Sequence, residues 1–410
     1  MSDPVKAPMR LPTLFILTTV SIDAMGIGLI LPVMPDLIAE IRGTDLSDAA
    51  RWGGILSATY AIMQFLCAPT LGSLSDRFGR RPILLISMAV LAVDYVVMSL
   101  AQTIWLLVIG RIIAGIAAGT HATALAYMAD ISDPGKRAQN FGLISAGFGM
   151  GFILGPLLGG VLGDIDPRAP FVAAAIASAA NFTFGYFVLP ESLPAGKRRR
   201  FDPARANPIG GLKQIEALPG AAPLLGVMMI YNIANFVYPA VWAYYTQAAF
   251  GWDSRMVGFS LASYGLAMAV VQAGLIRAIL PRLGSIRAVQ FGLVLNAVCL
   301  IGYGLISEAW MVWALIPISA LGAIVAPAMQ GVLSNAARDD QQGELQGVLA
   351  SISSLSMVLS PLVMTQAFFW ATRDGAALFL PGAPFLVAAL LMSGALALFM
   401  AHAGKPAPAR

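Results

Sequence analysis

The stretch GSLSDRFGRRP, residues 72–82, is a short polar connection between two long apolar segments. These segments, 52–74 and 82–101, each have the roughly 20 residues with which an α-helix crosses a hydrocarbon core about 30 Å thick. Pro82 suits the first turn of a helix, and Gly79 lets the chain turn tightly just before it. We therefore expect two membrane helices joined by a charged turn on one side of a bilayer.

The same alternation of apolar segments and polar breaks continues through the 410 residues. Hydrophobic residues make up 58% of the chain and charged residues only 11%, whereas a soluble protein has about 25% charged residues. Helices rather than strands follow from the segment lengths and from the need to satisfy every backbone polar group in lipid. The sequence predicts an all-α membrane protein with twelve helices, at 12–40, 52–74, 82–101, 104–130, 138–163, 168–190, 220–247, 254–279, 287–306, 310–335, 345–371 and 378–402.

The basic residues predict the orientation of these helices. Nineteen of the 25 Lys and Arg residues fall on one side of a twelve-helix topology, five fall on the other side, and Arg111 lies within a helix. Cytoplasmic loops carry an excess of Lys and Arg, so we expect both termini in the cytoplasm. The net charge of +4 and the pI of about 9.1 therefore indicate orientation rather than a nucleic-acid partner.

The two halves of the chain resemble each other at an offset of 205 residues, which places Gly79 on Gly284 and Pro156 on Pro361. The long polar connection between the halves, 191–219, is basic and rich in Pro and Gly, so it predicts a cytoplasmic linker. An amphipathic helix on the membrane surface is the alternative for 208–218. We expect an N-terminal six-helix bundle (1–190), the linker (191–219) and a C-terminal six-helix bundle (220–410), which is a transporter plan.

Ionisable residues inside the predicted helices are the main candidates for chemistry, because charge is costly to keep in lipid. The first half has Asp23, Asp94 and Arg111, whereas the second half has no acid at comparable depth. Asp23 and Asp94 are candidate proton carriers, with Arg111 as a counter-ion that keeps one acid charged until substrate or proton displaces it. The alternative is a static structural pair. His121 is a candidate for titration and substrate binding, or else for packing between helices.

The connection 72–82 also has the residue types of a gate. Its acid and its arginines can form charge-assisted hydrogen bonds that hold one conformation and break in another. A plain positively charged loop would explain the arginines, but not an acid and two glycines at this spacing. The expected gate residues are Gly72, Asp76, Arg77, Gly79, Arg80 and Arg81.

Glycines repeat every four residues in the segment 138–163, at Gly147, Gly151, Gly155 and Gly159. This spacing forms one flat helix face, which is suited to close packing on another helix. Pro156 is expected to bend that face. The face can serve as ordinary close packing, or as a hinge or seal between the halves.

The second half offers polar and aromatic side chains in place of charge, a surface that suits a flat amphipathic molecule. Packing between helices is the alternative for each of them. These residues are Tyr231, Asn232, Asn235, Tyr238, Trp242, Tyr245, Gln247, Gln272, Asn296 and Gln330.

Other classes of function lack support in the sequence. Two histidines exclude a histidine-rich metal site. There is no Walker-type phosphate loop, so direct use of ATP is not expected. An enzyme would need a nucleophile with a base or a metal, and none is visible. We expect a transporter rather than an enzyme.

These residues resemble the drug/proton antiporters of the major facilitator superfamily over nearly the whole chain. The connection GSLSDRFGRRP (72–82) is similar to that superfamily's motif between helices 2 and 3. GFGMGFILGPLLGG (147–160) resembles the helix-5 motif of its antiporters, Asp23 lies in a stretch similar to the helix-1 motif, and Arg111 in one similar to the helix-4 motif. SIDAMGIGLILPVMP (21–35) and APAMQG (326–331) resemble the tetracycline/proton antiporters most.

The resemblance implies export of a metal–tetracycline chelate in exchange for protons, by alternating access, across a bacterial inner membrane. It makes Asp23 and Asp94 substrate- and proton-linked acids, Asp76 and Arg80 the gate, and Asp130 an acid near that gate. It implies no cofactor beyond the coupling proton, a divalent metal only as part of the substrate, and function as a monomer.

The sequence departs from the tetracycline antiporters in the second half. Met268 and Asn296 stand where those pumps have a His in helix 8 and an Asp in helix 9, and Pro281 falls where the repeat would place Asp76. A multidrug exporter of the same superfamily is therefore the alternative function.

Overall fold

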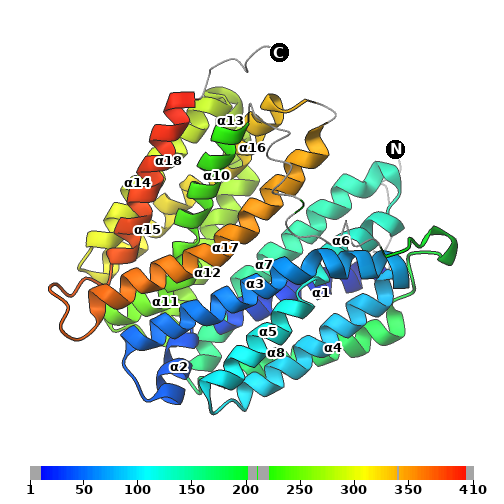
Figure 1. Cartoon of the computed structure of the whole chain (residues 1–410), viewed down its shortest axis with the longest axis horizontal. Helices are drawn as coiled ribbons and strands as arrows, with labels where there is room; N and C mark the ends of the chain where they lie inside the picture. Colours follow the sequence, from blue (N-terminus) through cyan, green and yellow to red (C-terminus); the bar gives the residue numbers. More distant parts are fainter. Residues whose placement is uncertain (1–10, 202–209, 211–220, 339–340, 403–410) are drawn as a thin grey trace, which may run out of the picture.

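The computed structural model describes residues 11–201, 210, 221–338 and 341–402, and these form helices and connections without a β-strand. Twelve of its helical segments are long and apolar enough to cross a membrane, which confirms the predicted all-α membrane fold. Figure 1 shows the helices in two bundles, one from the first half of the chain and one from the second half. Most of the predicted linker, 191–219, and of the alternative helix at 208–218 lies outside the described residues.

The N-terminal bundle contains α1 (Leu11–Ile30), α2 (Met34–Arg42), α3 (Leu46–Phe78), α4 (Arg80–Ser99), α5 (Ile104–Ala117), α6 (Thr120–Ile131), η1 (Pro134–Lys136), α7 (Arg137–Gly163) and α8 (Ala169–Val188). A short turn of 3-10 helix, η2 (Ala195–Lys197), follows it.

The C-terminal bundle contains α10 (Ala222–Asn235), α11 (Val237–Phe250), α12 (Ser254–Val270), η4 (Val271–Leu275), α13 (Ile276–Leu283), α14 (Ser285–Leu305), α15 (Ala309–Ala320), η5 (Leu321–Ile324), α16 (Val325–Ala336), α17 (Gln342–Thr372) and α18 (Ala383–His402). The segment η4 is one turn of π-helix, within a span that runs from α12 through α13.

The first predicted helix, 12–40, is wrong in its second part. The structure ends α1 at Ile30 and begins the separate helix α2 at Met34. Proline lacks a backbone N–H and disfavours helical geometry in the residue before it, so Pro32 ends α1, whereas Pro35 is tolerated in the first turn of α2. The next helix begins earlier than predicted, at Leu46, because the side chain of Asp45 accepts a hydrogen bond from the backbone N–H of Asp48 (3.1 Å).

The 205-residue offset relates matching backbone features of the two bundles. Gly79 ends α3 with φ 108° and Gly284 ends α13 with φ 73°, a region that favours glycine. Pro156 and Pro361 lie inside α7 and α17. Each bundle therefore repeats the same helix–turn–helix and the same proline-containing helix.

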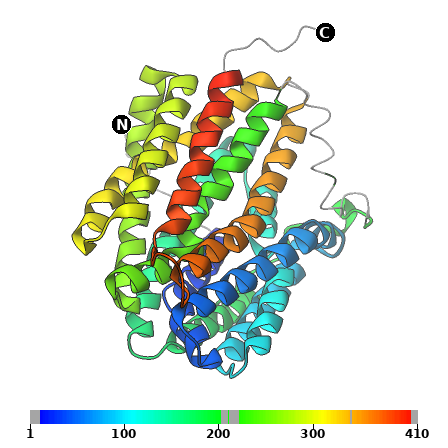
Figure 2. The same cartoon turned by 60° about the vertical axis from the view of Figure 1, so that its left-hand side comes forward.

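The two bundles meet along α3 with α17 and along α7 with α12. Figures 1 and 2 show α3 and α17 close together near α2 and diverging toward the ends of the bundles that carry the chain termini. We call these the α2 end and the termini end. Hydrogen bonds join the bundles at the α2 end, between Ser47 and Thr372 (2.9 Å) and between Asp36 and Ser254 (2.8 Å). The bundles are therefore held together at the α2 end.

The glycine face of α7 packs within the N-terminal bundle, against α1. A Cβ atom at Gly151, Gly155 or Gly159 would lie less than 3.0 Å from backbone atoms of α1. The contact between bundles uses a neighbouring position, where Gly160 of α7 packs directly on Gly258 of α12. The four-residue glycine repeat therefore serves close packing within the N-terminal bundle. The contact between the two halves is made by Gly160 instead.

We predict that Gly155→Ala destabilises the protein, because the new methyl group meets the backbone of Met25 and Gly28, which cannot move aside. Overpacking of this kind costs about 1–3 kcal/mol. The matched control is Gly149→Ala in the same helix, where a Cβ has nothing within 4 Å. Thermal unfolding in detergent should show a lower midpoint for Gly155→Ala alone, and an equal loss in both variants would contradict this packing.

Candidate functional site

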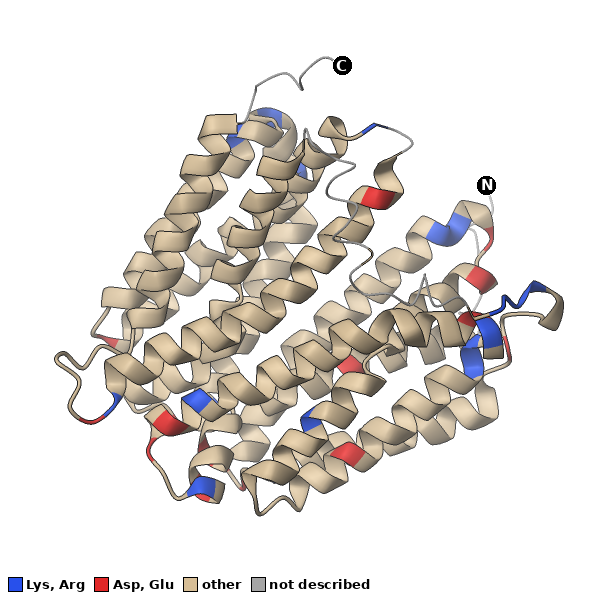
Figure 3. Cartoon of the chain, in the orientation of Figure 1, with Lys and Arg blue, Asp and Glu red and all other residues tan. Residues whose placement is uncertain are grey.

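Charged side chains inside the bundles are confined to a small region. Figure 3 shows Lys, Arg, Asp and Glu gathered at the two ends of the molecule, with a few at mid-height in the N-terminal bundle. Those few belong to α1, α4 and α5, the helices that carry Asp23, Asp94 and Arg111. The structure therefore brings the predicted proton-coupling residues into one bundle.

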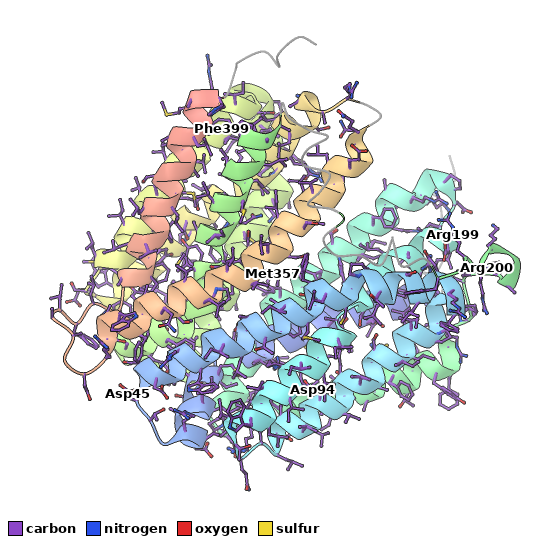
Figure 4. The ribbon with its side chains drawn as sticks, in the orientation of Figure 1. Asp45, Asp94, Arg199, Arg200, Met357 and Phe399 are labelled. Atoms are coloured by element: carbon purple, nitrogen blue, oxygen red, sulfur yellow. The ribbon has the colours of Figure 1, made fainter. Side chains whose placement is uncertain are left out.

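Asp94 and Arg111 form an ion pair, with Arg111 Nη2 3.2 Å from Asp94 Oδ2. Asp94 is 1% exposed, and Figure 4 places it within the N-terminal bundle. The other carboxylate oxygen, Oδ1, and the Nε atom of Arg111 are buried without a hydrogen-bond partner among the described residues. Leaving a buried polar atom unpaired costs about 1–3 kcal/mol, so the pair keeps unsatisfied hydrogen-bonding capacity inside the bundle.

Asp23 lies in the same electrostatic neighbourhood, and Thr120 of α6 lies beside its carboxyl group. Tyr60 of α3 interacts with Asp23, Asp94 and Arg111, and the Arg111 guanidinium lies 5.9 Å from the centre of the Tyr60 ring. Sequence reasoning did not identify Tyr60 or Thr120. No local pattern distinguishes them from other polar residues on apolar helices, and only the packing of α6 on α1 and of α3 on α5 brings them to the charged residues.

His121 follows Thr120 in the chain, but His121 is exposed whereas Thr120 is buried. Its ring packs edge-on against Phe148 of α7, with 5.5 Å between the ring centres. Successive residues of an α-helix point about 100° apart, so the two neighbours face different surroundings. The structure therefore favours helix packing for His121, and places it outside the cluster of Asp23, Asp94 and Arg111.

In the C-terminal bundle, Tyr238 and Trp242 of α11 belong to a buried group of aromatic rings. The Trp242 ring lies 5.3 Å from that of Tyr303 and 6.1 Å from that of Tyr238. Trp242 Nε1 donates a hydrogen bond to Ser260 Oγ (2.8 Å), so its polar atom is satisfied inside the bundle. The hydroxyl groups of Tyr238 and Tyr244, by contrast, are buried without a partner among the described residues.

A cavity of about 40 Å³ lies between the two bundles, where α11 faces α3 and the start of α2. Both unpartnered hydroxyl-bearing residues, Tyr238 and Tyr244, line it from the C-terminal bundle, as does Trp242. Gly53 and Ser57 of α3 line it from the other bundle. Two predicted substrate ligands, Tyr238 and Trp242, therefore reach the boundary between the bundles, and Tyr244, which sequence reasoning did not identify, lines the cavity with them.

The remaining predicted ligands do not gather at this cavity. Asn235 donates to the Tyr231 hydroxyl (2.9 Å), and Gln330 to Gln346 (3.5 Å). Gln272 is exposed in the π-helical turn η4, and Asn232 is half-buried in α10. Asn296 is buried, and its amide donates to the carbonyls of Gly292 (2.8 Å) and Gly322 (3.1 Å), which favours packing of α14 against η5 as its role.

The predicted gate residues form an ionic network at the termini end of the N-terminal bundle. Arg80 binds Asp76 (2.6 Å) and Asp130 (3.4 Å), which joins the start of α4 to α3 and α6. Arg81 donates to the carbonyl of Tyr186 (2.8 Å). Arg77 lies instead over the ring of Phe78, and a Cβ at Gly72 would meet open space.

Glu191 and Ser192 complete this network, and sequence reasoning missed both. The Glu191 carboxylate accepts a hydrogen bond from the backbone N–H of Arg80 (2.8 Å), and Ser192 donates to Asp130 (3.1 Å). The Glu191 carboxylate occupies the space that a side chain at residue 79 would need, which explains the glycine there. The network ties α3, α4 and α6 to the segment after α8, near Arg199 and Arg200 in Figure 4, rather than to the C-terminal bundle.

Comparison with known proteins agrees with this architecture. The model of the Major Facilitator Superfamily matches residues 16–361. The tetracycline resistance protein of class C from Escherichia coli is 41% identical over 353 residues, which cover 86% of this chain and 88% of that protein. The class G protein from Vibrio anguillarum is 37% identical over 390 residues, covering 92% of this chain and 98% of that protein.

Solved structures show the same fold at lower identity. The nucleoside transporter NupG superposes with a TM-score of 0.79 at 13% identity, covering 97% of this chain and 100% of that one. The human organic anion transporter MFSD10 (TETRAN) superposes with a TM-score of 0.70 at 23% identity, covering 96% and 100%. Fold and sequence lead to one conclusion: the chain belongs to the Major Facilitator Superfamily and, within it, to the tetracycline resistance proteins.

Proposed function

We propose that the protein exports a tetracycline-type drug from the bacterial cytoplasm across the inner membrane in exchange for protons, and so confers resistance to the drug. The names of the most similar relatives support the drug class. The observation that carries the proposal is the buried, incompletely hydrogen-bonded pair of Asp94 and Arg111, which shares the neighbour Tyr60 with Asp23. Intramembrane acids in such a setting are typical of proton relays.

Coupling arises by mutual exclusion between proton and drug. With Asp23 and Asp94 ionised, the N-terminal bundle presents negative charge to a cationic or metal-chelated drug. Proton binding neutralises that charge, and Arg111 is then left without its counter-ion. The positive charge of Arg111 disfavours a cationic ligand, so protonation expels the drug. A divalent cation takes part only as a component of the drug chelate.

Alternating access follows from the unequal closure of the two ends. Hydrogen bonds hold the bundles together at the α2 end, whereas the helices diverge toward the termini end. This arrangement supports an inward-facing conformation, in which drug and protons exchange with the cytoplasm. The orientation with both termini in the cytoplasm rests on the excess of Lys and Arg on that side.

A multidrug exporter on the same scaffold is the second candidate, and Asn296 is the observation that favours it. Its amide is committed to backbone carbonyls of α14 and η5, so it does not replace the acid of the tetracycline antiporters as a ligand. The cavity lining is aromatic and neutral on the C-terminal side. Such a surface accepts flat amphipathic molecules without requiring one arrangement of polar groups.

We predict that Asp23→Asn and Asp94→Asn each abolish drug export, because neither variant can release and rebind a proton. In a pump-deficient bacterial host, both variants should leave tetracycline susceptibility at the level of the empty vector, whereas the intact gene protects. Asp45→Asn is the matched control, because Asp45 caps α3 at the α2 end and Asn also caps helices. Full protection by Asp94→Asn, with normal expression, would rule out its role in proton coupling.

We predict that Tyr238→Phe and Tyr244→Phe change the drug profile without loss of stability. Their hydroxyls line the cavity and have no partner in the described protein, so their removal breaks no internal hydrogen bond. A lost hydrogen bond to the drug is worth about 0.5–1.5 kcal/mol, or roughly 2- to 10-fold in apparent affinity. Transport in everted vesicles, with tetracyclines and a panel of amphipathic drugs, measures the change.

Tyr245→Phe is the contrasting variant for this experiment. The Tyr245 hydroxyl donates a buried hydrogen bond to the carbonyl of Tyr303 (2.6 Å), so its removal should lower stability without changing the order of preferred drugs.

If the intact protein protects against tetracyclines alone, the narrow function holds. Protection against unrelated drugs would establish the multidrug function instead.

A further inference from the structure

Asp36 lies where the two bundles join at the α2 end, and the proton coupling proposed for Asp23 and Asp94 does not use its carboxyl group. Its carboxylate belongs to α2 of the N-terminal bundle and contacts two residues of the C-terminal bundle. Ser254 Oγ lies 2.8 Å from Asp36 Oδ2, and Gln247 Nε2 lies 3.3 Å from both carboxylate oxygens. Ser254 Oγ also lies 3.1 Å from the carbonyl oxygen of Pro32, immediately after α1.

These distances fit a protonated Asp36 better than an ionised one. A serine hydroxyl has one proton, so Ser254 donates either to Asp36 or to the Pro32 carbonyl. With Asp36 ionised, one of these two short contacts lacks a proton. With Asp36 protonated, its O–H donates to Ser254 and Ser254 donates to Pro32, while Gln247 donates to the other carboxyl oxygen. The contacts of Asp36 with Ser254, of Ser254 with Pro32 and of Gln247 with Asp36 can then all be hydrogen bonds at the same time.

The charges around Asp36 also disfavour its ionised form. Burial raises the pKa of Asp36, and the negative charge of Asp253 at the start of α12 adds to this, while the hydrogen bonds from Ser254 and Gln247 oppose it. Among the helices packed against α2, α11 brings the neutral phenol of Tyr244 near Asp36.

The nearby cations are engaged elsewhere. Arg42 of α2 binds Asp48 of α3 (3.1 Å), and Arg168 binds Glu40 (2.7 Å). Arg51 of α3 lies over Phe369 (5.5 Å), and Arg255 of α12 lies over Phe259 (5.9 Å). Helix α5 also contacts α2, over a small area. The first residues of α5, from Ile104, are apolar, so α5 places no charge near Asp36 there. No guanidinium group among the described residues therefore neutralises Asp36.

We propose that Asp36 is a proton-operated latch: protonated, it closes the α2 end of the transporter, and ionised, it lets the bundles part there. The proposal deepens the function above and rests on proton-coupled transport. Asp36 acts as a positioning residue that makes closure depend on protons from the α2 side. The proton comes from water on that side, converts the carboxylate to the neutral acid, and returns to the same side when the bundles separate.

The sign of the pH effect follows from the two environments of the carboxyl group. In the closed end the pKa of Asp36 is raised by burial, whereas parting of the bundles hydrates the carboxyl group and removes that cause. The closed state therefore binds the proton more tightly and is favoured as the pH on the α2 side falls. This stabilisation is lost as that pH rises through the raised pKa.

The test measures access to the α2 end directly. Ser47 is 4% exposed and pairs with Thr372 across the two bundles, so a cysteine there reacts only when the bundles part. Ser47→Cys is introduced in a full-length chain carrying Cys67→Ser and Cys299→Ala, and spheroplasts are labelled with a membrane-impermeant thiol reagent at varied external pH. Exposed Ser307, between α14 and α15 at the same end, supplies the always-accessible control Ser307→Cys, which corrects for the reagent's own pH dependence.

We predict that acidification slows the labelling of Ser47→Cys by about fivefold relative to Ser307→Cys. Asp36→Asn, which imitates the neutral acid, should make labelling slow at every pH. Asp253→Asn should keep the slowing but move it to lower pH, because a like charge has been removed while the helix cap remains.

Two results would overturn the latch. One is a labelling rate of Ser47→Cys that still depends on pH in Asp36→Asn, or that does not depend on pH when Asp36 is intact. The other is labelling of Asp36→Asn that is fast at every pH, which would contradict the hydrogen-bonded geometry. No drug is present in these measurements, so a wrong assignment of the drug leaves their outcome unaffected, whereas drug susceptibility tests the export function separately.

Discussion

The cost of keeping charge in a hydrocarbon interior determines how this molecule is organised. An acid or base at the centre of a membrane helix costs about 2.5–3.5 kcal/mol in insertion measurements, so it persists only where it is paired or has a function. The chain places nearly all its charge at the ends of the bundles. The exceptions lie in one bundle and are Asp23, Asp94 and Arg111. Asp94 is only 1% exposed. Among the described residues, the candidate proton carriers inside the helices therefore lie in the N-terminal bundle.

The bundles themselves depend on close approach of backbones, because lipid provides no hydrophobic drive for helices to associate. Glycines of α7 let it lie directly on α1, and Gly160 with Gly258 brings the two bundles into backbone contact. Asp94 and Asp36 both belong to the N-terminal bundle, so changes at the two acids act on one set of closely packed helices. The ionic network of Arg80, Asp130 and Glu191 strengthens that bundle at its other end.

The sequence predicted the parts of the structure that local composition determines. The twelve spans follow from apolar length, and Asp94 and Arg111 stood out because charge is rare inside such segments. Asp36 did not stand out, because an unbroken helix over 12–40 would place it in an ordinary helix end. Only the break at Pro32 turns α2 so that Asp36 meets Ser254 and Gln247, which lie more than 200 residues away in the chain.

The partners of buried polar groups were equally inaccessible to sequence reasoning. Asn296 looked like a ligand because it is polar in an apolar helix, yet the amide is consumed by backbone carbonyls. Tyr244 looked like one aromatic residue among several, yet its hydroxyl is left unpaired at a cavity between the bundles. Tyr244 also lies near Asp36, and Met34 of α2 lines the same cavity. A cavity of about 40 Å³ is far smaller than the roughly 300 Å³ of a small-molecule site, so a drug would reach these hydroxyls only as the bundles part. Drug binding and opening of the α2 end would then share one small set of contacts.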